Sequence, residues 1–154
     1  MNSSLFALLI GFSSGLRTFT APAVVCWAAH LGRLNLHGSP FSFMGSKVTV
    51  AIFTLLALYE YVYDLLPKTP SRTTPGPLIA RIISGGLCGA CLFTSASHAW
   101  IVGALLGGIA AVVGAFAGYH ARKNLVQSLK AKDAMIAIPE DLVAIGLAYL
   151  AVTF

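Results

Sequence analysis

The chain has few charged residues and no segment polar enough to form a soluble domain of its own. Only 10% of its 154 residues are charged, whereas a typical soluble domain has about 25%. The net charge of +5 is spread too thinly to form a nucleic-acid-binding patch. Because 57% of the residues are hydrophobic and occur in long runs, the composition predicts an all-α protein, a polytopic bundle of membrane helices.

Residues that build metal and cofactor sites are also scarce. The three cysteines, Cys26, Cys88 and Cys91, lie in apolar segments, and the Cys88-x-x-Cys91 pair has no second pair with which to form a four-ligand zinc site. We expect these cysteines to be small packing residues. No glycine-rich phosphate loop, metal-ligand set or nucleophile–histidine–acid arrangement has a diagnostic spacing, so neither a metal nor a cofactor is expected.

Five long apolar segments are present, and they predict a single integral membrane domain over residues 1–154. The expected transmembrane segments are residues 5–31, 47–66, 77–95, 99–119 and 138–154. Between the last two segments, residues 122–137 are polar but keep apolar side chains at helical spacing. We expect them to form an amphipathic helix on the cytoplasmic leaflet.

The basic residues predict an orientation. With five spans, residues 67–76 and 120–133 share one side and carry six lysines and arginines, whereas the other side carries Arg33 and Lys47. The positive-inside rule then places the N-terminus in the cytoplasm and the C-terminus outside. Residues 67–76 also hold three prolines, which predict an extended loop.

Arg17 is the one ionisable residue in residues 5–29, which are long enough to cross a bilayer. A cation at mid-membrane depth costs about 2.5–3.5 kcal/mol on insertion scales, so Arg17 needs an acid, a set of carbonyls, a water-filled cavity or an anion. Glycine, serine and proline residues surround it. They predict either a broken or re-entrant first segment, as in transporter binding sites, or one kinked helix.

Two cations and four acids inside or at the ends of the spans form a candidate cluster for binding a substrate or an ion. They are Arg17, Glu60, Asp64, Arg81, Glu140 and Asp141. Glu60 and Asp64 share a helix face, and Arg81 lies at a similar depth, so we expect Arg81 to pair with one of them. A straight first helix places Arg17 about 10 Å deeper than Glu60, whereas a re-entrant or broken first segment removes this offset. Arg17 therefore either reaches inward to Glu60 or faces a cavity and an anion.

Glu140 and Asp141 have two interpretations. Pro139 followed by two acids is typical of the first turn of a helix, where the ring fits and carboxylates complement the dipole. A helix starting at Pro139 is short, however, and its acidic end then lies within reach of Arg81.

Small residues repeat at i, i+4 spacing in the third and fourth segments and predict close helix packing. They are Gly85, Gly89, Gly103, Gly107, Gly114 and Gly118. Because few residues separate the two segments, we expect them to form a tight antiparallel hairpin.

Several stretches carry a resemblance to a known family. They are Gly15-Leu16-Arg17-Thr18-Phe19-Thr20-Ala21-Pro22, Leu66-Pro67-Lys68-Thr69-Pro70-Ser71-Arg72-Thr73 and Glu140-Asp141-Leu142. Together they resemble the small bacterial membrane proteins of the domain of unknown function 4126 family, over nearly the whole chain. One departure is Leu65 after Asp64, where the family tends to have a polar residue. The resemblance implies a bacterial inner-membrane location and no established activity.

Three functions are compatible with these features. The first is a small transporter or channel for a solute or ion, acting as a homodimer packed on glycine faces and using the charged cluster. The second is a non-transporting structural or accessory subunit that binds another membrane protein. The third is an intramembrane enzyme acting on lipid, with Glu60 and Asp64 as acid–base groups or metal ligands. It is the weakest, because a third ligand is missing.

Overall fold

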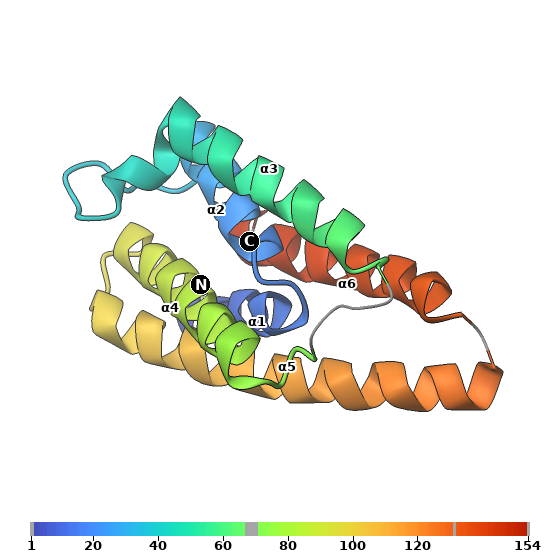
Figure 1. Ribbon diagram of the computed structural model, residues 1–154. Helices are drawn as coiled ribbons and strands as arrows, with labels where there is room; N and C mark the ends of the chain where they lie inside the picture. Colours follow the sequence, from blue (N-terminus) through green and yellow to red (C-terminus); the bar gives the residue numbers. More distant parts are fainter. Residues whose placement is uncertain (1, 67–70, 131, 154) are drawn as a thin grey trace.

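The computed structural model describes residues 2–66, 71–130 and 132–153, and within this part of the chain all regular structure is helical. The helices are α1 (Ser3–Leu16), α2 (Thr20–His30), the short 3₁₀ helix η1 (Ser42–Gly45), α3 (Lys47–Tyr63), α4 (Pro75–Ser95), α5 (Trp100–Leu129) and α6 (Asp133–Thr153). Figure 1 shows α1 near the middle, with α4 and α5 on one side of it and α2 and α3 on the other. The predicted all-α class is confirmed.

Several helix ends follow from local sequence. The Ser46 hydroxyl accepts a hydrogen bond from the Thr49 N–H at 3.2 Å and so caps the start of α3. Proline opens α4 at Pro75, where a missing N–H costs nothing. The helix α5 ends at Lys130, whose backbone is left-handed with φ of 48°. Residues 67–70 of the predicted extended loop lie outside the described residues.

The first apolar segment is two helices, so the predicted break is present and the single kinked helix is wrong. The break comprises residues 17–19, and Arg17 has an extended backbone with φ of −137° and ψ of 122°. Side-chain contacts show that α1 runs parallel to α5 and antiparallel to α6. Gly11 lies against Gly107, for example, and the Ser13 hydroxyl donates to the Ala144 carbonyl at 2.7 Å.

The helix α2 turns back along α3. Near the break, the hydroxyl groups of Thr20 and Tyr61 form a hydrogen bond of 2.7 Å. Farther along, the Trp27 ring N–H donates to the Thr54 hydroxyl at 3.1 Å. The two helices α1 and α2 therefore form a hairpin with Arg17 near its tip. Its open end lies where Ser3 and Arg33 line the same cavity of about 140 Å³.

This hairpin bears on the predicted orientation of the termini. Thr153, at the end of α6, lines the same small cavity as Ser3. Ser3 and Thr153, near the beginning and end of the described chain, therefore lie at one end of the bundle, whereas the side of the membrane on which each terminus lies stays a prediction. A straight first span crosses the bundle once and brings the total to five crossings. A hairpin instead returns the chain to the end at which it started.

Helix length supports a membrane protein but does not establish five spans. Three helices are long and apolar enough to cross a bilayer, at Pro75–Ser95, Trp100–Leu129 and Ala134–Thr153. The helix α3 has 17 residues, whereas α1 and α2 have 14 and 11. About 20 residues span the hydrocarbon core, so neither half of the first segment crosses it alone.

The connection between α5 and α6 also differs from the prediction. The expected amphipathic helix over residues 122–137 is not a separate element, because its first part continues α5 to Leu129 and its last part belongs to α6. Pro139 therefore lies inside α6, and the interpretation of Glu140 and Asp141 as the start of a helix is wrong.

The third and fourth segments form the expected hairpin, with α4 and α5 in close contact. A Cβ atom at Gly85 would lie 2.7 Å from the Gly107 carbonyl oxygen, and one at Gly89 would lie still closer to the Gly103 carbonyl oxygen. Gly114 instead faces Phe12 of α1, where an added Cβ would overlap the backbone. Glycine thus allows α5 to approach both α4 and α1.

Candidate functional site

Arg17 lies at the tip of the α1–α2 hairpin and is completely buried, with a side-chain exposure of 0%. Its guanidinium forms ion pairs with Asp64, directly after α3, and with Asp141 on α6. It also lies over the Tyr61 ring, 5.9 Å from the centroid. The prediction that Arg17 lies deeper than every acid is wrong, because the hairpin brings it to the same end of the bundle as these carboxylates.

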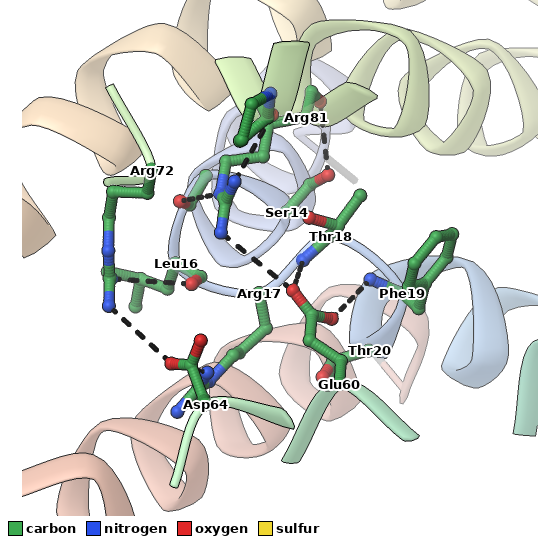
Figure 2. A network of polar contacts seen from close by, with 12 residues as sticks. Ser14, Leu16, Arg17, Thr18, Phe19, Thr20, Glu60, Asp64, Arg72 and Arg81 are labelled. Atoms are coloured by element: carbon green, nitrogen blue, oxygen red, sulfur yellow. Dashed lines mark hydrogen bonds and ion pairs between the residues drawn. The ribbon is translucent and has the colours of Figure 1, made fainter. Parts of the chain in front are cut away.

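The carboxylate of Glu60, on α3, binds the backbone just before the start of α2. Its two carboxylate oxygens accept hydrogen bonds from the Thr18 N–H at 2.8 Å and the Phe19 N–H at 2.9 Å (Figure 2). The first N–H groups of a helix have no partner within the helix and carry partial positive charge. The carboxylate therefore satisfies the backbone at the break and complements the helix dipole.

Two arginines contact the backbone carbonyl groups on the other side of the break, where α1 ends. Arg81 Nε donates to the Gly15 carbonyl at 3.1 Å, and Arg72 Nη1 lies 3.4 Å from the Leu16 carbonyl (Figure 2). Cations favour the negative C-terminal end of a helix. The Ser84 hydroxyl donates to the Thr18 carbonyl at 2.5 Å and anchors the tip on α4. The broken backbone is thus matched by charges of the correct sign at both of its ends.

The expected partner of Arg81 was Asp64 or Glu60, and the structure selects Glu60. Arg81 Nη2 lies 3.8 Å from Glu60 Oε1, a distance longer than a hydrogen bond, and Arg81 Nη1 donates to the Pro77 carbonyl at 3.1 Å. The side chain is 7% exposed. Arg81 is thus a buried cation whose contact with an acid is long.

Two further arginines, which the sequence analysis assigned only to topology, complete the cluster. Arg72 forms a two-pronged ion pair with Glu140, one prong of which is 3.1 Å long. Arg122 of α5 lies 3.0 Å from Asp64 and 3.5 Å from Glu140. A signal for Arg122 was present, because it follows Gly118 by four residues and so continues the inward face of small residues on α5. Arg72 lies in a segment without helical periodicity, which gave no indication of its direction.

All six predicted site residues therefore come together at one end of the bundle. With Arg72 and Arg122 they form what we call the charged cluster: Arg17, Glu60, Asp64, Arg72, Arg81, Arg122, Glu140 and Asp141. Its four arginines balance its four acids. None of these side chains exceeds 20% exposure, so each ion is largely removed from water.

A cavity of about 770 Å³ opens beside this cluster, between the end of α3, the start of α4 and the last turns of α5. Glu60, Asp64, Arg72, Arg81 and Arg122 all contribute to its wall. Ligand pockets commonly measure about 300–1,000 Å³, so the space suits a small molecule or part of a larger one. Arg17, Glu140 and Asp141 lie behind this wall and support it.

The comparisons with known proteins support the resemblance found in the sequence. A family model described as Domain of unknown function (DUF4126) matches residues 5–154. The chain belongs to this DUF4126 family. No curated protein and no solved structure matches it. The matched residues include every member of the charged cluster, so the site lies wholly within the DUF4126 region.

The DUF4126 site has the chemistry of ion pairing and anion recognition rather than of metal binding. Among the residues that the structure describes, no group of three or more histidine, cysteine or acidic side chains is placed to hold a metal ion. Within this part of the chain, Glu60 and Asp64 gain arginines as neighbours and no third ligand of this kind. The guanidinium groups present forked N–H donors, which match carboxylates and phosphates.

Proposed function

We propose that the protein is a small transporter or channel for a solute or ion, with the charged cluster as its binding region. The observation that supports this proposal is the cavity of about 770 Å³ whose wall contains six ionised side chains. Ion pairs that only fix the positions of helices need no open space beside them. Ionisable residues within a membrane protein commonly mark substrate or ion pathways.

The few contacts of α3 with α4 and α5 favour α3 as the helix that moves. This helix carries Glu60 and Asp64, yet its main helix contacts are with α2 and η1 rather than with α4 or α5. The cavity separates its last turns from α4 and α5. We propose that α3 moves against the other helices, exchanging the ion pairs of Glu60 and Asp64 for contacts with the substrate. Ion pairs are suited to this role because several arginines surround each acid.

The glycine contacts change the proposed dimer. The glycines of α4 and α5 face each other or α1, so they are not free to form an interface with a second copy. A homodimer therefore requires other faces, such as the exposed apolar surface of α6 that includes Leu142 and Tyr149. We also propose a bacterial inner membrane with the charged cluster on the cytoplasmic side, because Arg122 and Lys123 lie at this end.

Reconstitution tests the proposal. Purified protein in liposomes is expected to carry protons, chloride or phosphate, followed with a pH-sensitive dye and ion-selective electrodes. Glu60→Gln and Arg17→Ala are expected to abolish the flux. Lys47→Gln, at the opposite end of α3, is the matched control and retains it. Equal flux in wild type and both cluster variants would overturn the proposal.

A structural or accessory role is the second candidate, and the observation that favours it is the balance of four arginines and four acids. In this case the cluster fixes the α1–α2 hairpin and the protein binds another membrane protein. Exchanging the charges of Arg72 and Glu140 is then expected to restore the stability that each single reversal removes. No flux is expected, and a membrane complex co-purifies with both the wild type and the exchanged variant.

A further inference from the structure

The large cavity has two chemically different parts. Its inner wall is charged, with Glu60 and Asp64 facing Arg72, Arg81 and Arg122. Its rim is aromatic and apolar, with Phe19, Tyr59, Tyr63, Leu66, Tyr119 and Val126. A small inorganic ion needs the first part only. A molecule with a charged head and an apolar body uses both.

The charge of the lining favours an anion. Four basic side chains, including Lys123 at the rim, face two acidic ones. Among the arginines of the lining, Arg81 has the longest contact with its nearest acid, the 3.8 Å approach of Glu60. Within the described chain no hydrogen bond from Arg81 Nη2 is found, so this N–H₂ group is free to donate to a ligand. A guanidinium and nearby tyrosine hydroxyls are donors that suit phosphate oxygens.

The rim reaches the outer surface of the bundle. Tyr59 is 63% exposed and Leu66 is 53% exposed, so the α3 side of the opening faces the region that lipid occupies. Tyrosine is common at the level of the headgroups, and basic pockets between membrane helices bind anionic headgroups. The cavity therefore lies where a phospholipid can enter sideways.

We propose that this cavity binds an anionic phospholipid, with the phosphate on Arg81 and Arg122 and the acyl chains over the apolar rim. The proposal rests on the proposed function in that the same cavity is the binding region, and it names a ligand of that region. Inorganic phosphate offers the same phosphate oxygens as the lipid headgroup. The apolar rim selects the lipid, because it adds burial that inorganic phosphate does not provide.

Native mass spectrometry of the purified protein tests the proposal with three probes: dihexanoyl phosphatidylglycerol, dihexanoyl phosphatidylcholine and inorganic phosphate. Phosphatidylglycerol is expected to bind at least about tenfold more tightly than the other two, the factor that about 1.4 kcal/mol produces. Arg81→Gln removes the least occupied donor and is expected to weaken phosphatidylglycerol binding about tenfold. Arg33→Gln, at the opposite end of the bundle, is the control and leaves binding unchanged.

A second pair of variants tests the cavity without changing any charge. Val126→Trp fills the space from α5, and phosphatidylglycerol binding is expected to disappear. Val113→Trp places the same side chain on the exposed face of the same helix, where Val113 is 54% exposed, and binding is retained. Binding that survives Val126→Trp overturns the proposal even if Arg81→Gln fails to fold. Equal affinities for phosphatidylglycerol and inorganic phosphate, or for the two lipids, also overturn it.

These binding measurements need no transport, so they separate the two proposals. Lipid binding without flux of any solute supports this site and contradicts the transporter. Flux that requires Glu60, in a protein that does not prefer phosphatidylglycerol, supports the transporter and contradicts this site.

Discussion

The α4–α5 contact and the charged cluster both hold helices together in an apolar environment, but by opposite means. At Gly89 and Gly103 the helix backbones touch directly, and no polar side chain has to leave water. At the cluster, long charged side chains bridge helices that stay farther apart, and a cavity remains beside them. Close packing of small residues suits a permanent scaffold, whereas bridged ions allow rearrangement. The comparison therefore places the scaffold at the glycines and supports the proposal that the charges carry the function.

The largest effect is expected from removing the central cation with Arg17→Met. Asp64 and Asp141 then lose a buried partner, and breaking a buried ion pair from one side costs about 3–5 kcal/mol. Thermal or denaturant unfolding in detergent, followed by tryptophan fluorescence, measures the change in the free energy of unfolding. Arg33→Met is the control, with an expected change within about 0.5 kcal/mol. Equal stability of the two variants would show that Asp64 and Asp141 do not need Arg17 as a partner.

A smaller effect is expected from Gly107→Ala, which tests the scaffold. The added methyl group overlaps the backbone of Gly85, and overpacking of this kind costs about 1–3 kcal/mol. Gly146→Ala in α6 is the matched control, because nothing lies within 4 Å of the new atom. Its stability is expected to rise by up to about 1 kcal/mol, since alanine is the better helix former. A Gly107 variant as stable as wild type contradicts the close contact between α4 and α5.

The smallest effect on stability is expected from Glu60→Gln. The amide keeps an oxygen for a backbone N–H of the break but loses the charge that complements the α2 dipole, worth about 0.3–1 kcal/mol. The same unfolding measurement detects the change, and Glu60→Leu, which keeps no acceptor, is expected to lose more. A small loss of stability together with a complete loss of flux assigns the Glu60 charge to function. Large losses of stability assign it to the scaffold.

The sequence predicted the components of the site better than their pairing. Low charge and long apolar runs were enough to indicate membrane helices, and the glycine, serine and proline residues around Arg17 indicated the break. The six candidate cluster residues were recognised because ionised groups are costly in an apolar segment. Arg72 and Arg122 were missed because basic residues near the ends of spans also have an ordinary role in setting orientation.

The errors share one cause, which is that hydrophobicity does not encode the direction of a segment. Arg17 was placed about 10 Å deeper than Glu60 on the assumption of a straight span. The α1–α2 hairpin brings the same residue to the end of the bundle where Asp64 and Asp141 lie. Likewise, Pro139 was read as a helix start, although residues 133–138 already belong to α6.

The sequence by itself indicated a helical membrane protein of the DUF4126 family with a broken or kinked segment at Arg17, because burial and backbone preference are local properties of a segment. Only the tertiary structure decided which acids neutralise Arg17 and that a cavity remains beside them. Ion pairing depends on which way each helix runs and on how closely its neighbours approach. Those are set by contacts between residues far apart in the chain, such as Gly11 with Gly107 and Glu60 with Thr18.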